Sequence, residues 1–366
     1  LADGTAARTL TLRRHADVVT AALDPLTFAS AVSSHLQVPN SLDGAVHARA
    51  RRLLDPFFAP APMAVLEPGL VELAASLVAD CAAREGFGAV SDLGTPFAVR
   101  AQSQWLGWSA DLEHELVDWV ADNRAATRSG DPARTAVVAG QFDTIIRGIL
   151  DERRHRRTSG AIDVTDELLA LRDETGRGFT DAELVSILRN WTGGDLASIA
   201  LCVGVIVHWL GEHQQHQGHL AAANDVQLDA AIDEILRIDD PFIANRRVAT
   251  HATEIGGCPV SAGDRVVLDW ASANRDPAAF GDPDAFEPAA NAEGNLVYGI
   301  GAHVCPGRPL ATLQLRILVR ALLAQASLPR HPALPQRLLQ CRQIAGALDL
   351  FPAALRIWPD HQQLLV

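Results

Sequence analysis

The feature that most constrains the fold is a long segment of apolar, helical periodicity that begins at Thr180 and runs to about Leu210. Its start has a local signal, because a threonine N-cap followed three residues later by Glu183 forms a capping box. A helix of this length exceeds the usual range for globular proteins. We therefore expect one helix to cross the whole domain, with the other elements packed around it.

Most of the remaining chain also has leucine and alanine at helical spacing. Strand signals cluster between residues 244 and 272, with turn glycines at Gly257 and Gly263 between them. This pattern predicts a mainly α fold with small β-sheets. Residues 1–366 are interpreted as a single domain. Because this domain begins abruptly at Leu1, we expect some of its N-terminal residues to be missing. The expected helices cover residues 44–57, 68–84, 95–106, 110–127, 134–157, 180–211, 227–237 and 309–324.

The composition excludes several functional classes. The 366 residues are 48% hydrophobic, enough for a large core, and the net charge of −13 argues against a nucleic-acid partner. No uninterrupted apolar run of about 18 residues occurs, so no membrane anchor is expected. An odd number of cysteines without framework spacing indicates reduced thiols and a cytoplasmic location. These cysteines are Cys81, Cys202, Cys258, Cys305 and Cys341.

Residues 298–307 (Tyr-Gly-Ile-Gly-Ala-His-Val-Cys-Pro-Gly) form a candidate metal-binding loop. Its three glycines allow a tight turn and close approach to a flat partner. Cys305 stands just before an expected helix, where backbone N–H groups and the helix dipole favour a thiolate. A zinc site is an alternative, because His303 and Cys305 are both zinc ligands. Zinc sites usually need two close pairs of ligands, and we find no second pair of this kind in the sequence.

The loop resembles the haem-binding signature of cytochromes P-450, which reads aromatic, two residues, Gly, x, Arg or His, x, Cys, x, Gly. These places are filled here by Tyr298, Gly301, His303, Cys305 and Gly307, although the family usually begins with Phe. The resemblance implies the cytochrome P-450 fold, with haem b between the long central helix and this loop. It implies Cys305 as the metal ligand. Further cofactor contacts are expected from Tyr298, Gly299, His303 and Gly307.

Other cations match the carboxylates of such a cofactor. On a helix, His47 and Arg51 are one turn apart, and two like charges on one face are unfavourable unless an anion lies there. In the family a similar His-x-x-x-Arg binds the haem propionates. By the same resemblance, Arg247 would bind the other propionate, with Arg246 as a near competitor, and His303 would complete the set. Each could otherwise be an ordinary solvated side chain.

Glu234 and Arg237 stand at i, i+3, between the long segment and the cysteine loop. Alone, such a pair is common on helix surfaces and contributes little. The P-450 family has Glu-x-x-Arg at this place as a buried structural network, so the resemblance makes both residues scaffold. The family often adds an arginine from the loop before the cysteine. Here Ala290 occupies that place, which leaves the third member open.

The middle of the long segment departs from the family. The adjacent glycines at 193–194 suggest a local bulge or a close ligand, because each costs a helix about 1 kcal/mol relative to alanine. The family has an acid and an alcohol after such glycines, which deliver protons to iron-bound dioxygen. In one register Leu196 and Ala197 replace both. We prefer the register in which Asp195 and Ser198 are the catalytic residues; the alternative is a core helix with an incidental aspartate.

The resemblance implies a haem-thiolate monooxygenase that inserts one oxygen atom from O2 into a small hydrophobic or aromatic substrate. Electrons would come from NAD(P)H through a ferredoxin or other reductase partner, and parts of the chain resemble haem domains of reductase-fused bacterial enzymes. Arginines after the cysteine could form a basic docking face for an acidic donor, or simply lie solvated on a helix. They are Arg308, Arg316 and Arg320. Alternatives are a peroxide-driven or non-oxidative enzyme, and a haem-binding sensor without turnover.

Two further segments give expectations about the pocket and about metals. Only 18 residues separate Phe28 from His47, the connection that forms a lid in the family. We expect a pocket open on that side or roofed by residues 110–157, without an extra helix over residues 32–42. A histidine-rich patch is a possible metal site or, more simply, a solvated polar connector. It comprises His208, His213, His216 and His219.

Overall fold

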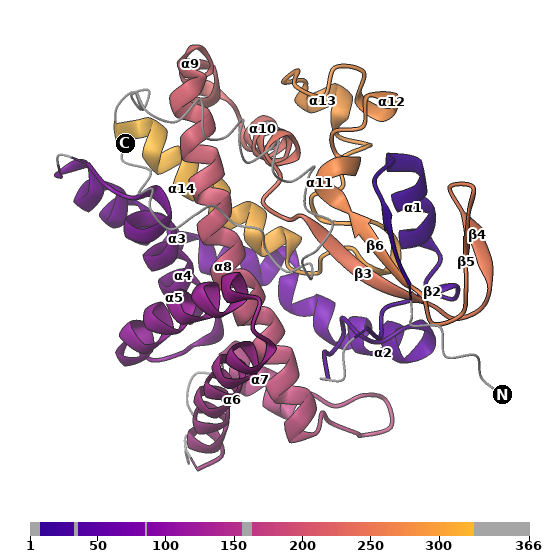
Figure 1. Cartoon of the computed structure of the whole chain (residues 1–366). Helices are drawn as coiled ribbons and strands as arrows, with labels where there is room; N and C mark the ends of the chain where they lie inside the picture. Colours follow the sequence, from indigo (N-terminus) through magenta and orange to yellow (C-terminus); the bar gives the residue numbers. More distant parts are fainter. Residues whose placement is uncertain (1–7, 33–35, 85, 156–162, 326–366) are drawn as a thin grey trace.

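The computed structural model describes residues 8–32, 36–84, 86–155 and 163–325. Helix α8 (Asp181–Glu212) crosses the centre of the molecule (Figure 1). Its start is the expected capping box: the Thr180 side chain accepts from the Glu183 N–H, and the Glu183 carboxylate accepts from the Thr180 N–H. The prediction of a single domain-crossing helix is confirmed.

The other helices surround α8. They are α1 (His15–Leu23), α2 (Gly44–Leu54), α3 (Pro60–Ala82), α4 (Thr95–Leu106), α5 (Glu113–Ser129), α6 (Pro132–His155), α7 (Val164–Ala170), α9 (Gln214–Ala222), α10 (Asp225–Ile238), α11 (Trp270–Ala273), α12 (Pro277–Phe280), α13 (Pro288–Asn291) and α14 (Arg308–Gln325). Short 3-10 or π turns are η1 (Asp55–Phe58), η2 (Ala89–Gly94), η3 (Ala110–Leu112) and η4 (Gly301–His303). Each expected helix overlaps an observed one; residues 156–157 of the expected 134–157 helix lie outside the described residues.

Two helical expectations were wrong in detail. Helix α3 begins at Pro60 and not at Pro68, because a proline is tolerated in the first turn of a helix, where its missing N–H needs no partner. The helix then continues through Pro68. The polar stretch after α8 is not a plain connector but helix α9, in which Gln217 donates to the Leu210 carbonyl (2.9 Å). Polarity alone thus did not separate an exposed short helix from a loop.

Small sheets lie to one side of α8 (Figure 1). Strands β1 (Thr9–Leu12), β6 (Arg265–Asp269), β3 (Ala244–Ala249) and β2 (Phe28–Ala29) form one sheet in that order, with β1 parallel to β6 and the other pairs antiparallel. Strands β4 (Thr253–Ile255) and β5 (Cys258–Val260) form a separate hairpin. The β-rich region between residues 244 and 272 was therefore predicted correctly.

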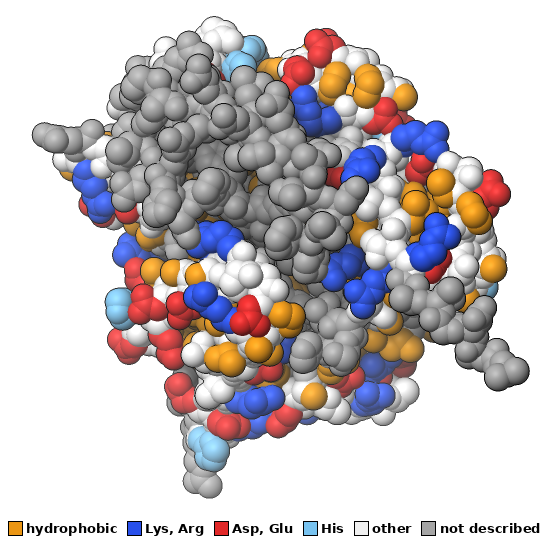
Figure 2. Space-filling model, viewed as in Figure 1, with side chains coloured by type: hydrophobic (Ala, Val, Ile, Leu, Met, Phe, Trp, Pro, Cys, Tyr) orange, Lys and Arg blue, Asp and Glu red, His pale blue; other side chains and the backbone are white. Residues whose placement is uncertain are grey.

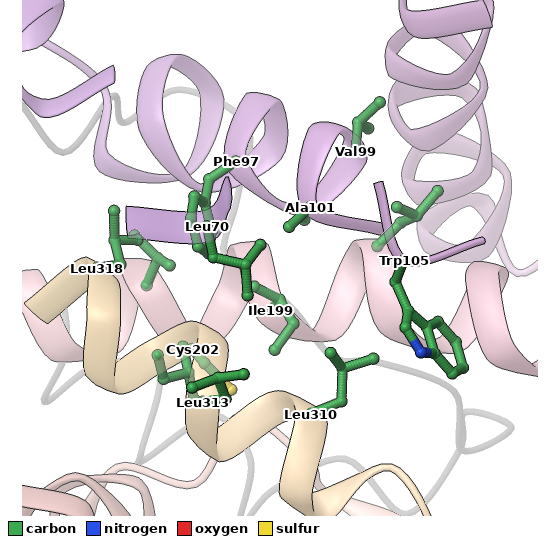
Figure 3. Packing of buried hydrophobic residues seen from close by; sticks show 14 of the residues in the cluster. Leu70, Phe97, Val99, Ala101, Trp105, Ile199, Cys202, Leu310, Leu313 and Leu318 are labelled. Atoms are coloured by element: carbon green, nitrogen blue, oxygen red, sulfur yellow. The ribbon is translucent and has the colours of Figure 1, made fainter. Parts of the chain in front are cut away.

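A large hydrophobic cluster joins α3, α4, α8, α10 and α14, and a smaller one lies between the sheet and α1. Figure 3 shows the centre of the large cluster, where side chains of α4 such as Phe97 face Ile199 of α8 and Leu313 of α14. This packing fixes α14 against α8. Because α14 follows the cysteine loop, it also fixes the position of that loop.

In the part of the chain that the structure describes, two helices, α3 and α8, are long and apolar enough to cross a membrane. The core helix of a globular protein passes the same test, and α8 is mostly buried. These helices therefore do not show a membrane anchor.

Candidate functional site

The cysteine loop is held in shape by its backbone. Gly299 and Gly301 have φ of +69° and +74°, the left-handed region that favours glycine. The Cys305 N–H donates to the Tyr298 carbonyl (2.9 Å) and closes the loop just before α14. At Gly307 a Cβ would stand 3.8 Å from the Cys305 sulfur, so glycine leaves space beside the thiol.

The Cys305 thiol opens onto space inside the protein. It is exposed, yet burial by the surrounding chain raises its pKa, against the lowering effect of the Gly307 N–H. A thiol that is accessible to solvent and yet surrounded by much of the chain lies in a recess of the protein and not on its outer surface. Asp195 is among the charges that raise this pKa, so α8 lies across the same space.

Helix α8 presents an open face to that space. Most of the helix around this point is buried, but Gly194 is exposed, and Gly193, Asp195 and Ser198 are half-buried. By contrast, Leu196 and Ala197 are buried. Residues at i, i+4 share a helical face, so Gly194 and Ser198 point the same way, with Asp195 beside them.

Asp195 is the titratable group on this face. Burial raises its pKa to about 7, and the Gln314 side chain acts in the opposite direction. Gln314, on α14, is fully buried; its side chain lies beside Asp195 and favours the carboxylate by hydrogen bonding, and among the described residues its amide has no other hydrogen-bond partner. Such groups are rare in native proteins, and a polar space is a common site for ordered water. We did not predict Gln314; the available signal was a polar residue on the apolar face of the last helix.

Aromatic side chains line one side of the site. Trp191 of α8 contacts Trp105 of α4 (ring centroids 5.0 Å apart) and Phe58 of η1 (5.4 Å). Phe58 also lies 3.8 Å from where a Cβ on Gly307 would stand, so the cluster reaches the cysteine loop. This wall joins the central helix to the loop.

The four predicted cofactor cations lie close together. The rings of His47 and His303 are 4.2 Å apart at their centroids. Arg51 donates to two carbonyls of the cysteine loop, those of Ala302 (3.1 Å) and Val304 (2.8 Å). The structure thus brings residues from α2 onto the loop, and Arg51 braces the loop as well as carrying charge.

Arg247 is the cation whose surroundings best fit an absent anion. Arg247 is 7% exposed, and its guanidinium donates to the neighbouring Arg246 carbonyl (3.0 Å). Burial lowers its pKa, which means that the site penalises an uncompensated positive charge. A carboxylate of a buried porphyrin would supply the missing compensation. The donor set therefore fits haem b.

Behind this site, Glu234 and Arg237 form the expected buried network. The Glu234 carboxylate accepts from Arg237 Nε (2.7 Å) and from its terminal nitrogen (2.9 Å). The third member, which the sequence left open, is Asn291, whose amide donates to Glu234 (2.7 Å). Asn291 adjoins the Ala290 position in which the family's arginine was expected, so an amide replaces a guanidinium.

Comparison with known proteins identifies the family. The family model for cytochrome P450 matches residues 129–333, more than half of the chain. Erythromycin C-12 hydroxylase of Saccharopolyspora erythraea is 31% identical over 326 residues, which cover 85% of this chain and 80% of that protein. The chain belongs to the cytochrome P450 family.

Other relatives agree. Linalool 8-monooxygenase of Pseudomonas putida is 27% identical to this P450, covering 84% of this chain and 80% of the relative. The open structure of histidine-tagged cytochrome P450 Eryk from S. erythraea matches with a TM-score of 0.77 at 27% identity, covering 89% of this chain and 85% of that one. This protein is therefore a P450 monooxygenase with haem b as its cofactor.

The connection that forms a lid in the family is short and tied to α8 in this P450. Its described part, residues 36–42, contains no helix. The Val38 N–H donates to Ser186 Oγ (2.8 Å), and the Val38 carbonyl accepts from the Asn190 amide (2.9 Å). Arg189 donates to the backbone just before them (2.7 Å). The expected absence of an extra helix holds for these residues, and their hydrogen bonds to α8 make them a fixed wall beside that helix.

The predicted basic docking face is neutralised in this P450. Arg308 pairs with Asp233 (2.9 Å), while Arg316 and Arg320 pair with Asp229 (2.5 Å) and Asp225 (2.7 Å). The three aspartates stand at i, i+4, i+8 on α10 and form an ion-pair ladder with α14. Charges of both signs are also interspersed on the coloured surface of Figure 2. These arginines hold two helices together, so they do not form an unpaired cationic patch.

The histidine-rich patch is not arranged as a metal site. Within the described ranges, no group of three or more His, Cys, Asp or Glu residues could hold a metal ion, which also argues against the zinc alternative for the loop. Instead, Trp209 stacks on His213 (4.5 Å between centroids), and His216 lies 5.1 Å from Phe286. The patch packs α9 onto the end of α8.

Proposed function

We propose that this P450 inserts one oxygen atom from O2 into a small hydrophobic or aromatic substrate in the cytoplasm. NAD(P)H would supply the electrons through a ferredoxin or other reductase partner. The observation that carries this proposal is the exposed Cys305 thiol, which lies near Asp195 on the open face of α8. Relatives named for a terpene alcohol, linalool, and for erythromycin leave the substrate size open.

The residues proposed to hold the cofactor come from three segments. Cys305 would ligate the iron, with Tyr298, Gly299 and Gly307 forming the loop around it. Arg247, His47, Arg51 and His303 would bind the propionates. When bound, haem with a thiolate ligand supplies the oxygen-transfer chemistry. The chain's own contribution is orientation, exclusion of water and control of protons.

Asp195 is proposed to hold and release the protons. A pKa of about 7 lets the carboxyl exist in both forms near neutral pH, which is what a proton-transfer group requires. Ser198 lies one turn further along the same open face and can pass a hydrogen bond onward. The buried Gln314 amide, which lies beside Asp195, is suited to hold water next to that carboxyl.

The fixed wall at residues 36–42 supports a small substrate. Its hydrogen bonds to Ser186 and Asn190 keep the chain against α8, next to the open face at Gly194. If residues 36–42 lay further from α8, there would be more room for substrate beside Gly194. Trp119 of α5 limits the adjoining side, since it lies 3.2 Å from where a Cβ on Gly193 would stand.

Substrate size can be tested by optical titration of the ferric holoenzyme. We expect small aromatics and linalool to bind at least about tenfold more tightly than a macrolide, a difference of about 1.4 kcal/mol. Asn190→Ala removes the hydrogen bond to the Val38 carbonyl, so it should reduce the difference in affinity between the small ligands and the macrolide. Tighter binding of the macrolide by the unaltered protein would contradict the small-substrate proposal and leave the P450 assignment intact.

Asp195→Asn should slow product formation about a hundredfold, the low end of the usual contribution of a general acid or base. The amide cannot exchange a proton, so NADH consumption should continue while product per NADH falls. Ser198→Ala should show the same uncoupling to a smaller extent. Unchanged coupling in both variants, together with efficient use of added peroxide by the unaltered protein, would favour the peroxide-driven alternative, which the buried Leu196 and Ala197 also suit.

The same variant has a pH-dependent effect on stability. Burial raises the Asp195 pKa from 3.8 to about 7, so the folded state binds more protons and stability falls as pH rises through this window. Asp195→Asn removes this penalty, which begins above pH 3.8 and is complete above about pH 7, so it should raise the melting temperature more at pH 8 than at pH 5. Asp122→Asn, at an exposed position of α5, is the control and should show no such pH dependence.

A further inference from the structure

Asp43 has an unusual role at the start of α2. Aspartate is a preferred N-cap, and capping contributes about 0.5–2 kcal/mol to helix stability. Asp43 occupies the N-cap position, yet its side chain accepts no hydrogen bond from its own helix. The carboxylate is directed instead to two segments distant in sequence.

Both carboxylate oxygens have distant partners. Asp43 Oδ2 accepts from the backbone N–H of Ser30 (2.7 Å), and Oδ1 lies 2.9 Å from His303 Nε2. The Ser30 hydroxyl, which is also buried, lies 3.1 Å from the same ring nitrogen. An ionised carboxylate only accepts, so Nε2 carries the hydrogen and the orientation of the His303 ring is fixed. Asp43 thus joins the end of β2, the start of α2 and the cysteine loop.

Asp43 also lies within the cluster of cations. Burial lowers the pKa of His47 (to about 4), of His303 and of Arg247, and the Asp43 carboxylate opposes this lowering in each case. The Asp43 carboxylate partly compensates the buried charge of Arg247. The carboxylate is therefore shared by three of the four residues proposed to receive the cofactor's propionates.

We propose that Asp43 is a positioning residue for the haem site: it orients His303, fixes the cysteine loop against α2 and β2, and lies where it compensates the buried charge of Arg247. This inference rests on the proposed haem-binding residues and adds to them a carboxylate that the sequence did not single out. Partners behind the groups that hold a metal cofactor commonly change its affinity 10–100-fold.

The test uses purified holoenzyme and two variants. In Asp43→Ala we expect haem transfer to excess apomyoglobin to be about tenfold faster or more. In Asp43→Asn, one oxygen still accepts from Ser30, so haem loss should be intermediate. Its reduction potential should shift to a more positive value, because removing a nearby negative charge favours the reduced iron.

Asp276→Asn is the matched control, because Asp276 is also an N-cap aspartate that binds a distant backbone N–H, that of His15 (2.8 Å). It should leave haem transfer and potential unchanged. Equal haem loss in the control, or wild-type transfer and potential in both Asp43 variants, would overturn the proposal. If Asp43→Ala does not fold, Asp43→Asn and its potential decide. Failure of the haem assignment itself would appear differently, as an absent thiolate spectrum in the unaltered protein.

Discussion

Cys305→Ser should abolish the reduced carbon-monoxide band at about 450 nm, the property for which the family is named. Serine preserves the shape of the loop but offers a hydroxyl, which is not a thiolate and does not donate electron density to iron in the same way. Substrate oxidation supported by NAD(P)H should fall below detection. The measurements are the difference spectrum of the dithionite-reduced, carbon monoxide-treated protein and the haem content per chain.

The chain offers a matched control for this experiment. Cys258, on β5, is also an exposed free cysteine, but it lies in the separate hairpin. Cys258→Ser should keep the full band and the full haem content. A normal band in Cys305→Ser would contradict the assignment of Cys305 as the iron ligand, whatever the activity of the variant.

Local signals explain what could be predicted from the sequence. The start of α8 is set by Thr180 and Glu183, which lie within one turn of each other. The signature of the cysteine loop lies within ten consecutive residues, 298–307. The overlap of the expected helices with α2 to α6, α8, α10 and α14 has the same origin, since helical periodicity is a property of neighbouring residues. These features need no knowledge of which segments meet in space.

The features that were missed depend on contacts between distant segments. Asp43 looks like an ordinary N-cap, and only the fold brings it to His303, 260 positions away. Asn291 completes the Glu234 network across 57 positions. The acidic partners of the arginines on α14 are aspartates spaced four residues apart on α10, and this spacing can be seen in the sequence. Their pairing with that helix required the relative position of the two helices, which sequence periodicity does not give.

Arg237→Ala should cause the largest loss of stability, about 3–5 kcal/mol, because removing one partner of a buried ion pair leaves the other charge uncompensated. Glu234 is 1% exposed, so water cannot replace the guanidinium. Arg237 also donates to the carbonyls of Asn274 (2.8 Å), Pro283 (3.2 Å) and Ala285 (3.2 Å), which would lose this donor. A typical domain is stable by only about 5–15 kcal/mol. Urea unfolding followed by circular dichroism would measure the change.

A second ion pair with the same spacing, but exposed to solvent, distinguishes the effect of burial from the effect of pairing. Arg14 and Asp17 have the same i, i+3 spacing and the same 2.7 Å distance, but the arginine side chain is 67% exposed. Arg14→Ala should therefore cost at most about 1 kcal/mol. The double variant Glu234→Gln with Arg237→Met, which removes both buried charges, should recover part of the loss in Arg237→Ala. Similar unfolding free energies for Arg237→Ala and Arg14→Ala would show that Glu234 is not held as a buried charge.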